Sequence, residues 1–578
     1  MRLPCIYELG GSFRYVEYHY SGTHRVHKIS SFKKTTYVTR IINEAEKGKT
    51  IHELASLLVD DEITYEDINE FIHELIDSQI LKSELEVSVT GQDVFTVLIE
   101  KMQTCGIAED IISKMQAINC LLNQIDRTPV GQSMNLYGEI ISIVKTIGVS
   151  YESKFLFQTD MYKQPLKSSL SRQLVDNLHL AMEYLNKIPY ISGQTTLTGF
   201  QKAFSEKYEE QEIPLSEALD TDLGLCYLRG NQDIPNDLLA NIRYMPYTQR
   251  SIPQRSEISV FHGNLLKKYV MCIKDGSNAI ELDENFIPIQ NTKLDDLPST
   301  VYAMGSLLNI DQKPYIYLKG IVGGAGNLLG RFCHLNENIE TLCLDIASKE
   351  QELSPDVILA EITHLPESRV GNILFRPVLR KYEIPYLAKA SVENDYVIPL
   401  SDLYISVFNG KLRIRSKKLN KEIIPLLTTA HNFAYNALPV YQFLCEYRMQ
   451  FSRPGLYFHW DPIFDIFDYK PRIKYKNIVL ARQAWRVKHE DIEDNKDSLI
   501  DYLKIHKIER YVVIPDSDNE QFIDFEDENS VKLFLSTLKK KKRLVIEEFL
   551  FNPSDTPIKD NVGNSYSNEF IIPFYKSY

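Results

Sequence analysis

Several of the signals that define common classes of protein are missing from this sequence. Its 578 residues include 8 cysteines with no C-x-x-C pair, a pattern that fits neither a disulfide framework nor a structural zinc site. The first residues do not form a signal peptide, and no apolar run approaches the roughly 18 residues of a membrane-spanning helix. These absences predict a soluble protein of the reducing cytoplasm, without a transmembrane segment and with no bound metal or cofactor.

Positive charge is also in deficit. The chain has 65 Lys and Arg residues against 78 Asp and Glu residues, which gives a formal net charge of −13. A protein that coats DNA non-specifically needs a surplus of cations to neutralise phosphates. The composition therefore argues against that class, although a local basic groove on an acidic body remains compatible with it.

The common catalytic signatures are absent as well. The sequence contains no G-x-S-x-G elbow, no P-loop, no H-E-x-x-H motif and no protein-kinase set. A glycine-rich stretch at 324–330 differs from the dinucleotide fingerprint, because three residues instead of two precede its last glycine. Any enzymatic role must therefore rest on a less general arrangement of residues.

What is present is the composition of a folded protein, with 44% hydrophobic and 25% charged residues. We predict an α+β fold in three parts. Residues 1–92 form a winged helix-turn-helix module that binds peptide, and residues 93–255 are mainly helical. Residues 256–578 form a large mixed body rich in antiparallel strands.

Local patterns support this division. Helical periodicity marks the second part at Val94–Met102, Ala108–Gln124, Leu166–Asn186 and Thr198–Tyr208. Short apolar runs between Pro and Gly residues predict strands in the third part at Tyr269–Ile273, Tyr315–Leu318, Leu403–Val407, Leu412–Arg415 and Arg510–Ile514.

The winged-helix prediction rests on a hairpin followed by three short helices. Aromatic and β-branched runs at Phe13–Tyr20 and Arg25–Ser30 flank Ser21-Gly22-Thr23, which is typical of a hairpin. The first helix should cover about 33–45, and Thr50 with Glu53 forms a capping box at the start of the second. The third begins after Thr64 and repeats apolar residues at i, i+3, i+4, i+7 and i+8.

The charge of the third helix argues against DNA. Between Asp60 and Asp77 there are eight acidic residues and no Lys or Arg, so phosphates would repel this surface. One interpretation is a solvated acidic face. The other is a peptide-binding module in which a ligand adds as a strand to the hairpin edge beside the third helix. The residues expected to line that edge are Val26, Lys28, Phe71 and Leu75.

Polar residues interrupt apolar segments at four places. Gly323–Phe332 is a flexible loop that delivers Arg331, and the stretch Glu361–Glu383 places several arginines around Asn372. His431-Asn432 supplies a titratable imidazole, and Asp160 ends an apolar run. Singly, each is more simply a cap or a satisfied core group. Together they show the local inconsistency expected of a functional site.

One further run is basic. Lys539–Arg543 is five consecutive cations after a predicted helix, where cations complement the negative end of the helix dipole. Contact with a nucleic-acid backbone is the alternative.

The order of these segments resembles the N-terminal, glutamylating part of the class I lantibiotic (lanthipeptide) dehydratases. The most specific matching stretches are 361–384, which includes Leu365-Pro366-Glu367-Ser368-Arg369-Val370-Gly371-Asn372, and 428–432. Supporting stretches are 13–30, 90–91, 200–208, 213–220, 329–332, 460–462 and 471–472.

This resemblance implies a specific chemistry. Such enzymes take glutamate from glutamyl-tRNA, their co-substrate, and esterify Ser or Thr side chains of a ribosomal precursor peptide. A separate domain then eliminates the glutamate. By similarity, Asp160 and Arg331 belong to the catalytic site. The residues implied in binding tRNA or substrate are Arg369, Asn372, Arg376, Arg380, His431 and Asn432.

The resemblance also implies partners and departures. The winged helix of the family holds the precursor's leader peptide, and related enzymes act as dimers and work with a cyclase. An Arg-rich R-x-S-x-R-x-T-P-F-G signature of the family has no counterpart here, and the sequence stops near the start of the family's elimination domain. The chain is therefore expected to need a separate elimination protein. The alternative is a non-catalytic scaffold, or remnant, that binds the precursor.

Overall fold

The computed structural model divides the chain into two compact units. It describes residues 5–577 apart from 23, 47, 60–62, 130, 163–165, 167–168, 189–194, 228–258, 285, 287–293, 311, 368–369, 434–437, 461, 493–494 and 552–555. The first unit comprises Met1–Met161, Gln194–Tyr244 and Gly326–Phe451, and the second comprises Tyr162–Gly193, Met245–Ala325 and Ser452–Tyr578. Both units draw on residues from either side of position 255, so they cut across the linear division expected from the sequence.

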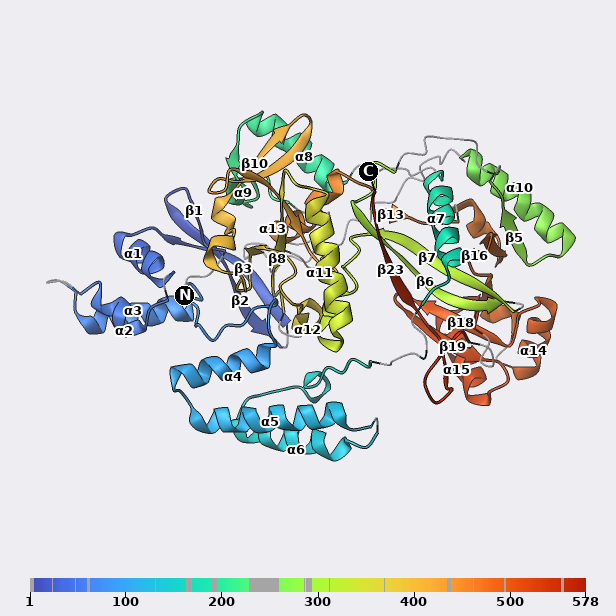
Figure 1. The fold of residues 1–578 in the computed structure, drawn as a ribbon, viewed down its shortest axis with the longest axis horizontal. Coiled ribbons are helices and arrows are strands. Elements are labelled where there is room, and N and C mark those ends of the chain that lie inside the picture. The colour runs from blue at the N-terminus through green and yellow to red at the C-terminus, as the bar shows by residue number, and fades with distance from the viewer. Residues whose placement is uncertain are drawn as a thin grey trace. The chain divides into compact units, whose positions relative to one another are not determined.

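The first unit begins with a hairpin and three helices, as the sequence predicts (Figure 1). The antiparallel sheet has the order β1-β2-β3. The elements of this N-terminal module are β1 (Tyr7–Leu9), β2 (Ser12–Ser21), β3 (His24–Lys33), α1 (Thr36–Ala45), α2 (Ile51–Ser56) and α3 (Tyr65–Asp77). Capping boxes are formed at α2 by Thr50 with Glu53 and at α3 by Thr64 with Asp67.

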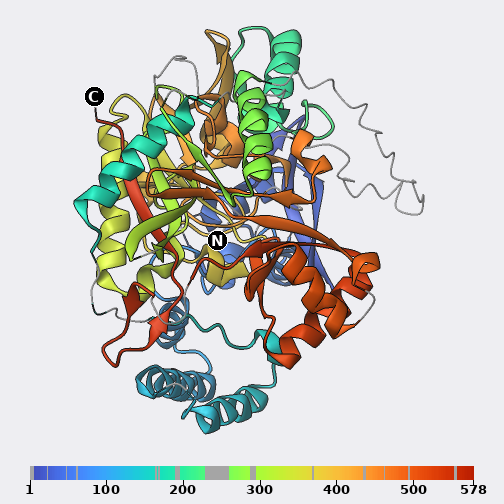
Figure 2. The same cartoon turned by 90° about the vertical axis from the view of Figure 1, so that its right-hand side faces the viewer.

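Three longer helices follow: α4 (Val94–Cys105), α5 (Glu109–Arg127) and α6 (Met134–Ile147), with the 3-10 helix η1 (Ser153–Phe155) after them. Helices α5 and α6 lie side by side, and Figure 2 shows the same pair from another direction. Their contact buries Ile118, Ile140 and Val144. η1 leads into the segment that carries Asp160.

The centre of the first unit is a six-stranded mixed sheet of order β4-β10-β11-β12-β8-β9. Its strands are β4 (Ile213–Pro214), β8 (Ile358–Thr363), β9 (Tyr382–Pro385), β10 (Leu403–Phe408), β11 (Lys411–Ser416) and β12 (Lys421–Leu426). The β4 to β12 half is antiparallel, whereas β12, β8 and β9 run parallel. β8 is the most enclosed of the six, because five of its six residues are buried.

Helices and short turns connect these strands. The helices are α8 (Thr196–Tyr208), α9 (Leu215–Ala218), α11 (Glu337–Glu352), α12 (Gly371–Leu374) and α13 (Pro439–Glu446). The 3-10 helices are η2 (Gly330–Leu335), η4 (Asn394–Tyr396), η5 (Leu400–Asp402) and η6 (Tyr447–Gln450). Among these, η2 and α11 carry the residues on which the candidate site depends.

The second unit contains two larger sheets. The first has the order β23-β6-β7-β16-β15-β5, with β13 also paired to β7. Its strands are β5 (Ala279–Leu282), β6 (Thr300–Ile310), β7 (Lys313–Gly323), β13 (Gly455–Leu456), β15 (Arg472–Tyr475), β16 (Ile478–Ala481) and β23 (Phe570–Tyr575). Helices α7 (Arg172–Asn186) and α10 (Val260–Asp275) pack their buried residues into the same core.

The other sheet is antiparallel with the order β14-β17-β20-β18-β19. Its strands are β14 (Tyr469–Lys470), β17 (Ala484–Lys488), β18 (Tyr511–Asp516), β19 (Asn519–Asp524) and β20 (Arg543–Glu548). The remaining elements of the unit are η7 (Pro462–Ile466), η8 (His489–Asp491), α14 (Lys496–Ile505), α15 (Glu528–Lys541), β21 (Ile558–Lys559) and β22 (Ser565–Tyr566). Within the described parts of the chain, no helix has the length and apolar character needed to cross a membrane.

One strand prediction is wrong. Tyr269–Ile273 lies in α10, whose buried residues recur at helical spacing: Phe261, Leu265, Tyr269 and Cys272. Gly276, in the left-handed conformation at φ +66°, ends the helix. The other predicted strands lie in β7, β10, β11 and β18.

The helical assignment of this segment is testable. Leu265→Ala removes a fully buried side chain of α10, whereas Val270→Ala shortens a side chain on the same helix that is 57% exposed. We expect Leu265→Ala to lower the free energy of unfolding by roughly 2–5 kcal/mol and Val270→Ala to change it by less than about 0.5 kcal/mol. Urea unfolding followed by circular dichroism measures both. Equal losses would contradict this burial pattern.

Candidate functional site

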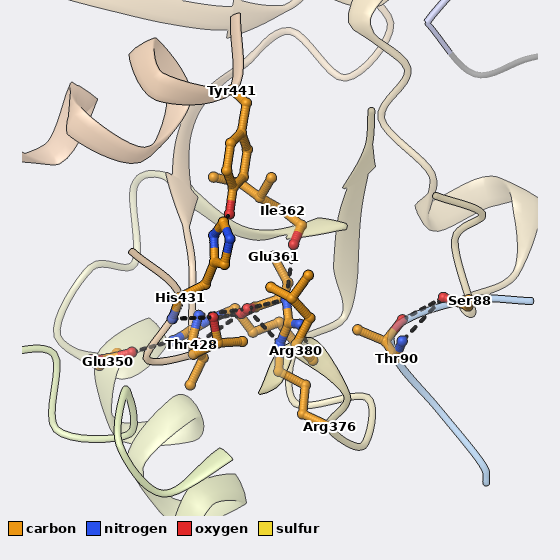
Figure 3. Close-up of polar contacts among 12 residues, drawn as sticks. Ser88, Thr90, Glu350, Glu361, Ile362, Arg376, Arg380, Thr428, His431 and Tyr441 are labelled. Carbon is orange, nitrogen blue, oxygen red and sulfur yellow. Dashed lines mark hydrogen bonds and ion pairs between the residues drawn. The ribbon is translucent and has the colours of Figure 1, made fainter. Parts of the chain in front are cut away.

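A buried carboxylate on β8 organises the first unit. Glu361 is 1% exposed. Its Oε1 accepts hydrogen bonds from Arg376 Nε at 3.0 Å and Arg376 Nη2 at 2.7 Å, and its Oε2 accepts one from Arg380 Nε at 3.1 Å. The backbone N–H and the hydroxyl of Thr428 donate to the same carboxylate at 2.7 and 2.8 Å. Figure 3 shows these donors converging on Glu361.

The charges around Glu361 decide its ionisation. Burial would raise the pKa of this carboxyl group, but the two guanidinium groups and the hydrogen bonds from Thr428 outweigh it and lower the pKa below its ordinary value. Glu361 is therefore ionised at neutral pH. We call Glu361, Arg376, Arg380 and Thr428 the Glu361 network.

The two arginines of the network direct their other donors into the protein, except for Arg380 Nη1, which is buried without a hydrogen-bond partner among the described residues. Arg376 donates to the carbonyl oxygens of Leu374 at 2.6 Å and Ile362 at 2.8 Å, and Arg380 also pairs with Glu350 of α11. Arg376 is 1% and Arg380 is 8% exposed. Neither guanidinium is open to tRNA or substrate in this structure, so both act here by holding segments of the first unit together.

The Glu361 network reaches two further segments. The Arg376 backbone bonds the stretch that contains Thr90, with its N–H donating to the Val89 carbonyl at 3.2 Å and its carbonyl accepting from Gly91 N–H at 2.9 Å. On the other side, Gly330 opens η2 against Thr428, where a Cβ atom would lie 2.5 Å from the Thr428 carbonyl oxygen. Only glycine fits there, and this contact fixes where η2 begins.

η2 presents Arg331 to Asp160. Arg331 Nη2 lies 3.1 Å from Asp160 Oδ1, and His334 Nε2, also on η2, lies 3.5 Å from Asp160 Oδ2. The side chains of Arg331 and Asp160 are 20% and 15% exposed. The Phe332 ring lies under the guanidinium, with 4.7 Å from its carbon to the ring centroid. The structure therefore brings together the two residues assigned to catalysis.

A second polar pair adjoins them. Asn372, at the start of α12, donates from Nδ2 to Gln158 Oε1 at 2.6 Å, and Gln158 lies two residues before Asp160. Asn372 Oδ1 and Arg331 Nε are both buried without a hydrogen-bond partner among the described residues. Buried polar atoms without a partner are uncommon in native proteins, and a ligand or a reaction that uses them is one explanation. We call Gln158, Asp160, Arg331, His334 and Asn372 the Asp160 cluster.

His431 and Asn432 have different surroundings. His431 Nδ1 lies 3.0 Å from the Tyr441 hydroxyl, and burial lowers the pKa of the imidazole (Figure 3). It is therefore neutral at pH 7. Tyr441 also contacts His364, whose ring is buried and whose pKa burial lowers well below the ordinary value. Asn432 is exposed. Arg369 lies outside the described residues.

The residues predicted to bind leader peptide lie in the N-terminal module. β3 is the edge strand of its sheet. Val26 is partly buried and Lys28 exposed on β3, while Phe71 is partly buried and Leu75 buried on α3. The backbone of Tyr18 on β2 is bonded by a side chain: its N–H donates to Gln79 Oε1 at 3.1 Å, and its carbonyl accepts from Gln79 Nε2 at 2.6 Å.

The basic run ends a helix, as expected. Lys539, Lys540 and Lys541 form the last turn of α15, and Lys541 Nζ lies 3.8 Å from Asp516 Oδ1. Complementing the helix dipole is the role that this position supports.

Two functional features escaped the sequence interpretation. His334 is absent from the residues predicted from the sequence, and its signal is a spacing of three residues from Arg331, which places both side chains on one face of a helix. The pairing of Asn372 with Gln158 joins residues 214 apart in sequence. No local pattern predicts such a contact.

Comparison with known proteins agrees with the resemblance. A family model described as "Lantibiotic dehydratase, N terminus" matches residues 2–534. Subtilin biosynthesis protein SpaB of Bacillus subtilis is 23% identical over 534 residues, which cover 88% of this chain and 50% of SpaB. Nisin biosynthesis protein NisB of Lactococcus lactis subsp. lactis is 22% identical, with 94% of this chain and 54% of NisB covered. The chain thus spans about half the length of these curated relatives.

The fold also has a solved counterpart. The tRNA dependent lantibiotic dehydratase MibB from Microbispora sp. 107891 superposes with a TM-score of 0.76 at 16% identity, covering 95% of this chain and 54% of MibB. The mixed α+β architecture rich in antiparallel sheet is therefore shared with MibB.

The Glu361 network predicts a large and specific cost of neutralisation. Glu361→Gln leaves the buried Arg376 guanidinium without a counter-charge and leaves Arg380 with Glu350 alone, which should lower the free energy of unfolding by roughly 3–5 kcal/mol. The matched control is Glu212→Gln. Glu212 also pairs with an arginine, with Arg415 Nε at 2.7 Å, but its side chain is 35% exposed. That substitution should cost less than about 1 kcal/mol.

The pH dependence of stability in wild type and in Glu361→Gln tests whether Glu361 is ionised in the folded protein. A carboxyl group with a lowered pKa in the folded state stabilises above its unfolded pKa of about 4.3. That contribution is lost as the pH falls through the lower folded-state value. Wild type should therefore lose stability below about pH 4.3 more steeply than Glu361→Gln does. Parallel curves in urea unfolding between neutral and acid pH would contradict the ionised assignment of Glu361.

Proposed function

The chain belongs to the lantibiotic dehydratase family, matching its N-terminal part over residues 2–534, and on that premise we propose that it transfers glutamate from glutamyl-tRNA to Ser and Thr hydroxyls of a ribosomal precursor peptide. Two solved relatives support this reaction through their own descriptions. MibB is described as tRNA dependent, and TbtB, at a TM-score of 0.61 and 16% identity over 99% of this chain, as a glutamylation domain from thiomuracin biosynthesis.

The chemistry of such a step suits the Asp160 cluster. An aminoacyl ester reacts by attack of the hydroxyl on its carbonyl carbon, and negative charge develops on the carbonyl oxygen. Arg331 provides a planar fork that binds a carboxylate or stabilises that oxygen. Asp160 holds the ammonium group of glutamate or the attacking hydroxyl. Glutamyl-tRNA is a co-substrate in this proposal.

One observation carries the proposal. Asp160 and Arg331 are 171 residues apart in sequence and form an ion pair at 3.1 Å. Both side chains keep some exposure, unlike the arginines of the Glu361 network. A pair that served stability alone gains little at such a position.

The N-terminal module suits recognition of the leader peptide as a winged helix-turn-helix. Tyr18 turns its N–H and carbonyl toward Gln79. Its partner across the hairpin, His27, therefore turns its own backbone groups to the outer edge of β3. No strand pairs with that edge in the described part of the chain. An extended peptide adding there would pack near Val26, Lys28, Phe71 and Leu75.

Arg331→Ala tests the catalytic assignment. With tRNA charged with radiolabelled glutamate and the precursor peptide encoded beside the gene, we expect transfer of label to the peptide by wild type. Loss of the guanidinium should slow transfer roughly 100- to 1000-fold. Arg415→Ala, which removes a surface arginine paired with Glu212, should leave the rate unchanged.

The outcomes separate the alternatives. Full transfer by Arg331→Ala would contradict the role of Arg331. Binding of the precursor by wild type with no transfer would contradict the enzyme and favour the non-catalytic scaffold.

His27→Pro tests recognition at the β3 edge. Proline removes the outward N–H while sparing the bonds between β2 and β3. His27→Ala is the matched control, because it removes the imidazole and keeps the N–H. We expect fluorescence anisotropy with a labelled leader peptide to show at least roughly fivefold weaker binding by the proline variant than by the alanine variant, equivalent to one lost hydrogen bond. Equal affinities would contradict strand addition at this edge.

A further inference from the structure

His334 shares a face of η2 with Arg331. Side chains three residues apart are eclipsed in a 3-10 helix, so positions 331 and 334 project in the same direction. Both reach the same carboxylate, Arg331 at Asp160 Oδ1 and His334 Nε2 at Asp160 Oδ2, 3.5 Å away. The two residues of η2 thus lie beside the same carboxylate.

The two nitrogens of His334 are in unequal positions. Nε2 faces Asp160, and a carboxylate favours the tautomer that carries its proton on the nitrogen facing it. This leaves the Nδ1 lone pair as the basic atom. The side chain is 46% exposed, more than Asp160 at 15% or Arg331 at 20%. A second substrate can therefore reach His334 while Asp160 and Arg331 stay engaged with each other.

The charged groups near His334 come from several elements. Asp160 and Arg331 are the nearest. α11, which packs on η2, brings Glu337 and Glu340 in its first turn, and α12, which also packs on η2, has no titratable side chain. The alternative histidine of the sequence prediction, His431, has its Nδ1 engaged by Tyr441. His334, by contrast, faces Asp160 with Nε2, so its Nδ1 remains for a substrate hydroxyl.

We propose that His334 is the general base of the transfer, accepting the proton of the Ser or Thr hydroxyl while Asp160 orients its ring. This inference rests on the proposed function. His334 Nδ1 takes the hydroxyl proton as the side-chain oxygen bonds to the carbonyl carbon of the glutamyl ester. The bond from that carbon to the ribose oxygen of the tRNA then breaks. The ribose oxygen takes the proton from the imidazolium, so no net proton is gained or lost.

The arrangement explains why three residues meet here. Attack by a neutral hydroxyl is slow, and a positioned base accelerates it. Asp160 sets the tautomer and stabilises the imidazolium that forms, as a carboxylate does beside a catalytic histidine in other acyl transfers. Arg331 stabilises the oxygen on which charge develops. A base, a carboxylate that orients it and an arginine that stabilises the electrophile are roles that acyl transfer to a hydroxyl uses.

Two substitutions separate a base from a merely positioning residue. His334→Gln places an amide N–H near the position of Nε2, so it can still donate to Asp160, but it has no basic atom. His334→Ala removes both. The full chain is mixed with tRNA charged with radiolabelled glutamate and the precursor peptide encoded beside the gene, and single-turnover transfer is followed from pH 5 to 9. His506→Gln, on an exposed residue that ends α14 in the second unit, is the control.

If His334 is the base, both His334 variants transfer glutamate roughly 100- to 10,000-fold more slowly than wild type and bind glutamyl-tRNA as tightly. Their rates lose the pH dependence that the base gives to the wild-type reaction, and added imidazole restores part of the rate to His334→Ala. His506→Gln behaves as wild type.

Three results would overturn the inference. A wild-type rate in His334→Gln would show that residue 334 serves only to donate a hydrogen bond to Asp160 and accepts no proton. A slowed variant with an unchanged pH profile and no rescue by imidazole would show a positioning role. Transfer by neither variant nor wild type would instead contradict the proposed function itself, and the inference would fall with it.

Discussion

The first unit depends on one buried negative charge. A carboxylate in the protein interior is stable only when its charge and its lone pairs are matched, and Glu361 has two guanidinium groups and two donors of Thr428 around it. The guanidinium groups come from one segment of chain and the Thr428 donors from another, and neither segment is the strand that carries Glu361. The charge therefore ties β8, the turn at residues 374–380 and the loop after β12 into one arrangement. Through Gly330, packed on Thr428, it also sets the start of η2.

That constraint divides the arginines into two kinds. Arg376 and Arg380 are buried and have their charge matched inside the protein, so their contribution is rigidity. Arg331 keeps partial exposure, a buried Nε with no partner among the described residues, and a single carboxylate beside it. Such a guanidinium can still donate hydrogen bonds to a ligand. The Glu361 network and the Asp160 cluster are adjacent because Gly330, which packs on Thr428, is the first residue of η2 and Arg331 is the second.

Local signals in the sequence predict local structure well here. The hairpin of β2 and β3 and the capping boxes at Thr50 and Thr64 depend on residues close together in the chain, and all are present. Tyr269–Ile273 shows the limit, because a short apolar run fits a buried strand and a buried helix equally well. Its helical spacing emerges only when Leu265 is counted with it.

The site was predictable in part, and for a different reason. Asp160 and Arg331 were identified by resemblance to a family, since nothing in either local sequence indicates that they meet. The burial of Arg376 and Arg380 depends on Glu361, whose partners are set by the sheet order β12-β8-β9. His334 depends on η2 being a 3-10 helix. Long-range topology decides the first two cases and the local form of η2 decides the third, and hydrophobic periodicity indicates neither.

The most direct test of this account is a structure of the chain with a non-hydrolysable analogue of the glutamyl-tRNA terminus, glutamate joined to the 3′-adenosine by an amide. The account predicts the glutamyl group beside Arg331 and Asp160, with the Glu361 network unchanged. The analogue bound elsewhere, with the ion pair of Arg331 and Asp160 undisturbed, would contradict it.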